Sequence, residues 1–150
     1  MTSVINETAM VEIGRKLGER LRGGEVIELV GDVGAGKTTL VKGLGIGLGI
    51  DEDVQSPSFT ISRVYQARDR LELHHYDFYR LSDAGVMRYE LAESINDPLV
   101  VTVIEWADTV QQVLPEHHYR IHIRYTPDGQ GRELDIQAPE PDMSLDEAVS

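Results

Sequence analysis

The residues of this chain best suited to chemistry form the run Gly31-Asp32-Val33-Gly34-Ala35-Gly36-Lys37-Thr38-Thr39. Two glycines separated by four residues and followed by Lys and a hydroxyl residue make the pattern of a phosphate-binding loop. Glycine lets successive backbone N–H groups turn toward a polyphosphate. Lys37 would reach the β- and γ-phosphates, and the Thr38 hydroxyl would ligate Mg²⁺. The run therefore predicts a nucleotide site built from Gly31, Asp32, Gly34, Ala35, Gly36, Lys37, Thr38 and Thr39.

The segments on either side of this loop have the order that the chemistry requires. Residues 25–30 predict a strand that leads into the loop, and residues 37–48 predict a helix that leaves it. The positive end of that helix would add to the attraction for phosphate. Glycine stands at every second position from 43 to 49, which we interpret as close packing of the helix on the sheet with a cap at Gly49.

Two carboxylates are candidates for the other side of the site. A phosphate loop needs acidic residues to hold Mg²⁺ or its waters and to position the attacking water. Asp77 lies near the end of an apolar segment, and Glu105 ends the β-branched run 100–104. Ligands of open α/β sheets bind outside the carboxyl ends of the parallel strands. We therefore expect Lys37, Asp77 and Glu105 to act together, although each acid alone could be an ordinary strand-end residue.

Other polar and aromatic residues are weaker candidates. Ser56, Ser58 and Thr60 lie on a loop that leads into a strand, where a sensor of the γ-phosphate would fit. Trp106 follows Glu105 directly and could stack on a ligand or partner, or belong to the core. The five histidines do not have the spacing of a dedicated metal site, since His74 and His75 point to opposite faces of a strand.

The remaining periodicity completes an α/β fold with three layers, in which helices flank a mixed central sheet. A helix over 6–22 would be capped by Asn6, and further helices are expected over 82–95 and 107–113. Strands are expected over 58–65, 71–79, 98–104, 118–126 and 132–138, with the first two forming an antiparallel pair. We expect one domain over 1–138 and a flexible acidic tail over 139–150.

Composition limits the classes of function. The net charge of −12 argues against a chain that grips RNA or DNA unaided, because nucleic-acid binders concentrate positive charge. The chain has no cysteine, which excludes thiolate metal sites and Cys nucleophiles. No secretory leader and no membrane-spanning run are apparent. We expect a soluble protein of the reducing cytoplasm.

Four segments together resemble the bacterial TsaE (YjeE) family, the small ATPase of tRNA threonylcarbamoyladenosine biosynthesis. These segments are the loop 31–39, Ser56-Pro57-Ser58-Phe59-Thr60, Tyr76-Asp77-Phe78-Tyr79-Arg80-Leu81 and Ile104-Glu105-Trp106. The loop is common to many families, and the other three make the match specific. The resemblance covers roughly residues 5–138. One departure is Ser58, which stands where the family usually has Thr. Serine keeps the hydroxyl that a sensor needs, but its side chain is less constrained than that of threonine.

The resemblance implies a P-loop NTPase-like fold, a cytoplasmic location and a weak intrinsic ATPase with ATP or ADP and Mg²⁺ as ligands. It implies association with the TsaB and TsaD proteins, which transfer threonylcarbamoyl to tRNA, so that tRNA is met only through the complex. By position, Lys37 and Thr38 would hold phosphate and Mg²⁺, and Asp77 and Glu105 would be the acidic pair. Residues 56–60 would form a switch-like segment, and Trp106 would lie beside the nucleotide or the partner.

Other functions remain open at this stage. A nucleotide-gated interaction module would use bound ATP or ADP to set its affinity for a partner, with negligible turnover of its own. A small-molecule kinase is disfavoured because no Arg-rich lid segment follows the central strands. A GTPase is disfavoured because the chain has no Asn-Lys-x-Asp segment.

Overall fold

The computed structural model describes residues 2–4, 6–32, 34–57, 61–79 and 85–139. Seven strands and three α-helices make up this part of the chain, joined by two short 3₁₀ helices. The strands are β1 (Thr2–Val4), β2 (Val26–Val30), β3 (Ser62–Gln66), β4 (Glu72–Asp77), β5 (Val100–Glu105), β6 (Tyr119–Tyr125) and β7 (Arg132–Gln137). The α-helices are α1 (Glu7–Arg20), α2 (Lys37–Gly47) and α3 (Met87–Asn96), and the 3₁₀ helices are η1 (Arg68–Arg70) and η2 (Ala107–Val110).

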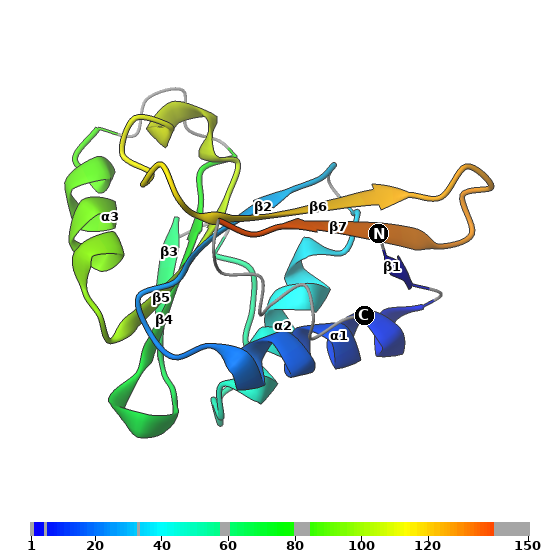
Figure 1. The fold of residues 1–150 in the computed structure, drawn as a ribbon, viewed down its shortest axis with the longest axis horizontal. Helices are drawn as coiled ribbons and strands as arrows, with labels where there is room; N and C mark the ends of the chain where they lie inside the picture. Colours follow the sequence, from blue (N-terminus) through cyan, green and yellow to red (C-terminus); the bar gives the residue numbers. More distant parts are fainter. Residues whose placement is uncertain (1, 5, 33, 58–60, 80–84, 140–150) are drawn as a thin grey trace.

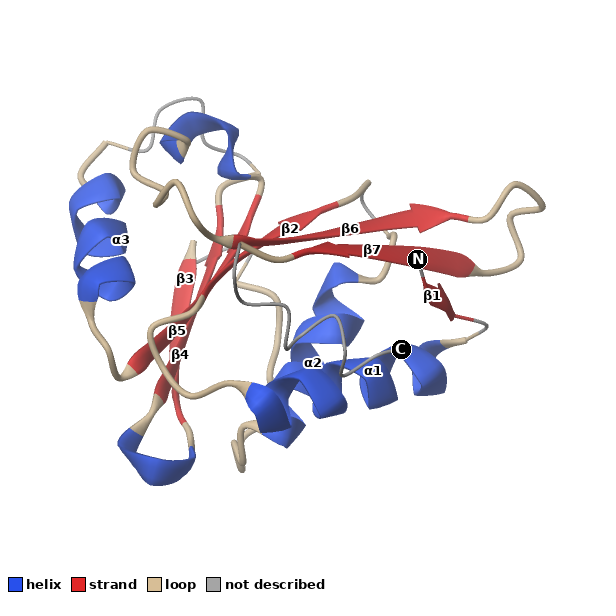
Figure 2. Ribbon diagram, in the orientation of Figure 1, coloured by secondary structure: helices blue, strands red, loops and turns tan. Residues whose placement is uncertain are grey.

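The strands form one mixed sheet in the order β1-β7-β6-β2-β5-β4-β3. The central strands β6, β2, β5 and β4 are parallel, and β1, β7 and β3 add antiparallel pairs at the two sides. Helices α1 and α2 lie together against one face, and α3 lies on the other side beside β4 and β5 (Figures 1 and 2). The predicted three-layer α/β fold and the predicted hairpin of β3 and β4 are both confirmed.

Strand β5, in the middle of the sheet, is apolar on both faces because elements on both sides of the sheet cover it. Every residue of β5 is buried, which explains the continuous β-branched run in the sequence. Side chains of alternating residues enter two apolar clusters, one under α1 and α2 and one beside α3. The four parallel strands point the same way, so their carboxyl ends meet at one edge of the sheet.

Glycines bring the backbones of α1 and α2 into direct contact. Gly14 and Gly18 of α1 face Gly43 and Gly47 of α2, and a Cβ added to Gly43 would lie 2.2 Å from the carbonyl oxygen of Val11. The expected close packing is therefore present, but its partner is α1 and not the sheet. The sequence pattern missed this because glycines four residues apart in two separate helices form one face only after the helices meet.

A single arginine anchors the ends of the same two helices. Arg68 in η1 donates hydrogen bonds to the carbonyl oxygens of Gly18, Leu21 and Gly47 at 3.2, 2.6 and 2.7 Å. These carbonyls belong to the C-terminal ends of α1 and α2, where helices lack internal donors and where a positive charge is favourable. The tip of the β3–β4 hairpin is thereby fastened to the helical layer.

Some element boundaries differ from the sequence expectations. Strand β1 was not predicted, because three residues carry too little alternation to show a period. Helix α3 begins at Met87, later than the predicted 82, and the residues expected to cap it lie outside the described ranges. Strand β3 begins at Ser62. None of the described helices is long and apolar enough to cross a membrane.

Candidate functional site

The predicted phosphate loop connects β2 to α2 at the edge where the parallel strands end. Its turn is closed by a hydrogen bond from Ala35 N to the Asp32 carbonyl oxygen at 3.0 Å. Gly36 precedes α2 with φ 114°, a conformation that only glycine adopts without strain. Thr38 lies half-buried in the first turn of α2, whose free N–H groups face the loop. The arrangement is that of an anion-binding helix start.

Lys37 is buried within the site. The residue is 6% exposed, Nζ donates to the Gly31 carbonyl oxygen at 2.6 Å, and the ring centroid of Trp106 is 4.0 Å from Nζ. Burial lowers the pKa of Lys37, while the nearby charges of Glu105 and Asp77 oppose this change. The amine contacts two neutral groups, the Gly31 carbonyl and the Trp106 ring, and an incoming anion would replace them as its partners.

Asp77 and Glu105 are direct neighbours at the ends of β4 and β5. The parallel register pairs Asp77 with Glu105, and Glu105 also pairs with Leu29 of β2, just before the loop. Burial raises the pKa of Asp77, the charge of Glu105 raises it further, and a hydrogen bond from Tyr79 N lowers it. The strand-end rule thus places Lys37, Asp77 and Glu105 at one edge of the sheet. They lie close enough there that the charges of the other two affect the pKa of Lys37 and the pKa of Asp77.

A buried histidine contacts this acidic pair and was missed in the sequence. His75 Nε2 lies 2.6 Å from Glu105 Oε2, and the two side chains are 0% and 4% exposed. His75 lies two residues before Asp77 on β4, so both side chains point to the same face. The spacing of His75 and Asp77 was the available signal, and the neighbouring His74 obscured it.

Trp106 borders the site from the position between β5 and η2. Its ring packs against Tyr79 with centroids 4.7 Å apart, and it also contacts Lys37. The backbone of Trp106 has φ 56°, and that of Ile61, whose carbonyl accepts from Asp77 N, has φ 69°. Positive φ is uncommon for such residues, and strain of this kind clusters at functional sites. Trp106 thus contacts Lys37 of the candidate site and also packs against the core cluster beside α3.

Two residues of β6 and β7 hold the loop from its other side and were not predicted. Tyr125 donates to the Gly34 carbonyl oxygen at 3.1 Å, and Arg132 Nε donates to the Ala35 carbonyl oxygen at 3.0 Å. The guanidinium of Arg132 also lies 4.0 Å from the Tyr125 ring centroid. These contacts join residues more than 90 positions apart. They follow from the pairing of β6 with β2 on one side and with β7 on the other.

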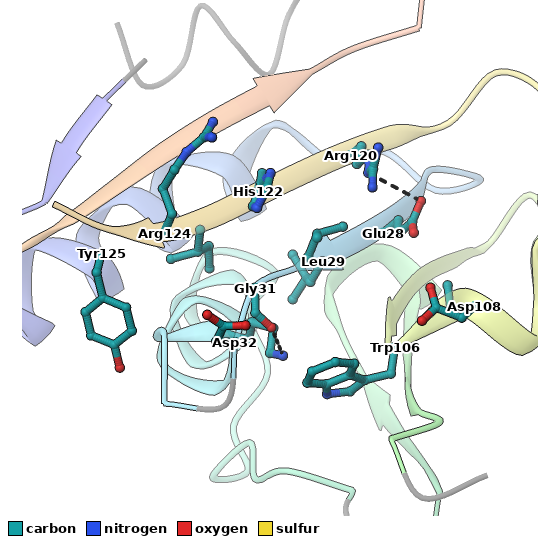
Figure 3. A pocket seen from close by; sticks show the side chains of 14 residues that line it. Glu28, Leu29, Gly31, Asp32, Trp106, Asp108, Arg120, His122, Arg124 and Tyr125 are labelled. Atoms are coloured by element: carbon teal, nitrogen blue, oxygen red, sulfur yellow. Dashed lines mark hydrogen bonds and ion pairs between the residues drawn. The ribbon is translucent and has the colours of Figure 1, made fainter. Parts of the chain in front are cut away.

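Two cavities border the loop. One of about 230 Å³ lies between β2, β6 and η2, and Arg120, His122 and Arg124 line it in a row beside Asp32 (Figure 3). Another of about 340 Å³ lies on the β7 side and is lined in part by Gly34, Ala35, Gly36 and Thr39. Every predicted residue of the loop therefore either lines one of these two cavities or, like Thr38, lies in the first turn of α2.

Glu28, in the first cavity, forms a partly buried pair with His118. Glu28 Oε1 lies 3.0 Å from His118 Nε2, which raises the pKa of His118 and lowers that of Glu28. The stabilisation needs a protonated His118 and an ionised Glu28. It is complete below the unfolded histidine pKa near 6.5 and is lost as pH rises through the higher folded value. It is also lost as pH falls below about 4.5 and through the folded pKa of Glu28.

We therefore expect the pair to favour the folded state most between about pH 4.5 and 6.5. Between pH 6 and 8, the wild type should lose on the order of 1 kcal/mol more unfolding free energy than His118→Gln, which keeps a donor without the charge. Urea unfolding of both proteins at the two pH values measures the difference. Parallel losses in the two proteins would contradict the assignment.

Some predicted residues cannot be placed. Ser58 and Thr60 lie outside the described residues, and Ser56 lies in the described loop just before them. Within the described ranges, no group of three or more His, Cys, Asp or Glu side chains gathers in a manner suited to a metal ion. Thr38, Asp77 and Glu105 nevertheless offer the hard oxygen donors that Mg²⁺ prefers, and this ion commonly uses one or two carboxylates with phosphates and waters. The donor set fits Mg²⁺ bound together with a nucleotide.

Comparison with known proteins gives consistent matches. The profile of a family described as "Threonylcarbamoyl adenosine biosynthesis protein TsaE" matches residues 4–134. The chain is 41% identical over 123 residues to the tRNA threonylcarbamoyladenosine biosynthesis protein TsaE of Treponema pallidum, covering 82% of this chain and 89% of that protein. It is 42% identical over 118 residues to the protein of the same name from Streptomyces coelicolor, covering 76% and 78%.

A solved structure is similar over nearly the whole chain. The crystal structure of YdiB from Bacillus subtilis superposes with a TM-score of 0.75 and 30% sequence identity. The match covers 98% of this chain and 90% of the other. The likeness extends beyond the phosphate loop to the whole mixed sheet and its helices.

Proposed function

The chain belongs to the TsaE family of threonylcarbamoyl adenosine biosynthesis proteins, and we propose that it is a Mg²⁺-dependent ATPase required for threonylcarbamoyladenosine modification of tRNA. One observation supports this reading most strongly. The lysine of a phosphate loop lies close to two carboxylates at adjacent strand ends, and both carboxylates affect its pKa. A loop that only binds anions has no need of two acids placed where they repel phosphate.

The substrate would be held mainly by the loop. Backbone N–H groups of the loop and of the first turn of α2 would surround the phosphates, and Lys37 would exchange the Gly31 carbonyl for phosphate oxygens. Thr38 and one of the carboxylates would hold Mg²⁺. When bound, the ion would neutralise charge on the β- and γ-phosphates.

The chain's own residues would then supply the remaining chemistry. Glu105, at the end of the central strand β5, would orient the attacking water and accept its proton, since a carboxylate at hydrogen-bond distance can do both. Asp77 would help to hold Mg²⁺ or its waters. Lys37 and Glu105 are buried and Asp77 is half-buried, so their charges interact more strongly than they would in water, where the dielectric constant is higher.

Glu105→Ala is expected to lower the rate of ATP hydrolysis by about 100-fold or more, since a positioned general base contributes that much. The affinity for ATP should change much less, because the loop carries the binding. Single-turnover phosphate release and calorimetric titration separate the two quantities, and Glu116→Ala, at an exposed position, is the matched control. Equal turnover by wild type and Glu105→Ala would remove the catalytic assignment.

The proposed partners are the TsaB and TsaD proteins, with tRNA reached only through their complex, in the cytoplasm. The net charge of −12 supports docking on a protein complex over direct binding of tRNA. A nucleotide-gated module is the second candidate. The aromatic pair Tyr79 and Trp106 favours it, because Trp106 contacts Lys37 and a partner bound to this pair could distinguish the nucleotide-bound site from the free one. Phosphate release with and without the purified partners distinguishes turnover from gating.

The decisive cellular test is nucleoside analysis of tRNA after depletion of this protein. We expect threonylcarbamoyladenosine to fall and to return when the wild-type chain is supplied. An unchanged level of the modified nucleoside would reject the proposed role in tRNA modification, whatever the chain does with ATP in isolation.

A further inference from the structure

His75 is a buried polar residue to which the proposed function assigns no role. Its side chain is fully buried on β4, between the registers of Arg63 in β3 and Val103 in β5. Nε2 lies 2.6 Å from Glu105 Oε2. An ionised carboxylate can only accept hydrogen bonds, so Nε2 must be the donor. A buried imidazole that donates to a carboxylate is usually there to fix a geometry.

The second ring nitrogen of His75, Nδ1, indicates what orients the imidazole. Among the described residues, His75 Nδ1 has no hydrogen-bond partner. The ring is therefore oriented by the packing of the sheet around it and by Glu105 itself. A single hydrogen bond from a rigid strand fixes one oxygen of a side chain that would otherwise rotate about three bonds. The second oxygen is then held in a constant direction at the carboxyl end of β5.

We propose that His75 is a positioning residue that holds the Glu105 carboxylate in the orientation needed to direct the attacking water. The inference rests on the proposed ATPase function, because it assigns to His75 a role in that same site. A positioning role and a purely structural role predict different kinetics. A buried pair that served only the fold would change stability and leave the ratio of turnover to binding unaltered.

Three substitutions separate these roles. His75→Leu keeps an apolar volume without a donor, His75→Gln places an amide N–H near the position of Nε2, and His75→Asn carries the same amide on a shorter side chain. We expect kcat to fall about 10- to 100-fold in His75→Leu and His75→Asn, the range seen when residues supporting a site are removed. We expect KM and ATP affinity to stay near the wild-type values, and His75→Gln to recover most of kcat.

Several outcomes would overturn the proposal. These are a wild-type kcat in all three variants, equal losses in His75→Gln and His75→Asn, or a rise in KM that matches the fall in kcat. Thermal unfolding of each variant accompanies the kinetics. If His75→Leu does not fold, the comparison of the two amides decides, since they differ in reach and not in polarity. All kinetics use the full chain, with the partner proteins present if turnover needs them.

A spectroscopic readout makes the inference independent of turnover. Nitrogen-15 NMR of the imidazole should show the proton of His75 on Nε2 in the wild type, with a downfield shift that disappears in Glu105→Gln. A proton on Nδ1, or a signal unaffected by Glu105→Gln, would refute the positioning contact. A wild type that hydrolyses no ATP while showing this signal would instead reject the proposed function and leave the contact established.

Discussion

Lys37→Ala is expected to abolish ATP turnover and to weaken ATP binding by about 100-fold, which corresponds to about 3 kcal/mol for a charged hydrogen-bonding group. The amine is already buried beside the site, so its contribution needs little ordering on binding. Lys37 is the only Lys or Arg in the run 31–39. The remaining backbone N–H groups would still attract phosphate, which is why some affinity is retained.

Calorimetric titration with ATP and Mg²⁺ measures this loss, and phosphate release measures the turnover. Lys42→Ala is the matched control, because Lys42 lies exposed in the same helix α2. In cells depleted of the native protein, Lys37→Ala should fail to restore threonylcarbamoyladenosine where Lys42→Ala succeeds. Normal affinity in Lys37→Ala would show that the loop does not hold the triphosphate in the proposed manner.

Gly43→Ala should destabilise the fold by about 2 kcal/mol or more, even though alanine is favoured over glycine inside a helix by about 1 kcal/mol. The added Cβ would lie 2.2 Å from the carbonyl oxygen of Val11 and 2.9 Å from the Cα of Gly14. Both contacts are with backbone, which cannot rotate away. The helices α1 and α2 would have to separate, and the start of α2 carries Lys37 and Thr38.

The control for this change lies two residues away. At Gly45 an added Cβ would lie 2.7 Å from Cγ2 of Val54, so the close contact is with a side chain and not with backbone. Gly45→Ala should therefore destabilise the fold less than Gly43→Ala does. Urea unfolding compares the two variants. Equal stability of Gly43→Ala and Gly45→Ala would mean that the helix contact tolerates more space than its geometry indicates.

Elements with a periodic hydrophobic pattern or a recognisable motif could be predicted from the sequence. The loop 31–39 predicted its own strand and helix, and the β-branched run before Glu105 predicted a strand buried on both faces. The rule for strand ends also brought Asp77 and Glu105 to the same edge. These inferences succeeded because each depends on local order along the chain.

Contacts between distant segments could not be predicted in the same way. Tyr125 and Arg132 support the loop through its carbonyl oxygens, and any side-chain donor in their positions could do so. The bond from His75 to Glu105 depends on the register of β4 against β5, which the sequence does not state. The sensor residues Ser58 and Thr60 lie outside the described ranges, so their expected role remains a prediction.

Trp106 is the single tryptophan of the chain, and its indole lies 4.0 Å from the Lys37 amine. A positive charge held over an indole changes the energy of its excited state, because the ring has a negative face. Any ligand that draws the lysine away must therefore alter the intrinsic fluorescence of the protein. Occupancy of the site can be followed by one native chromophore, without a label and without a second tryptophan to dilute the signal.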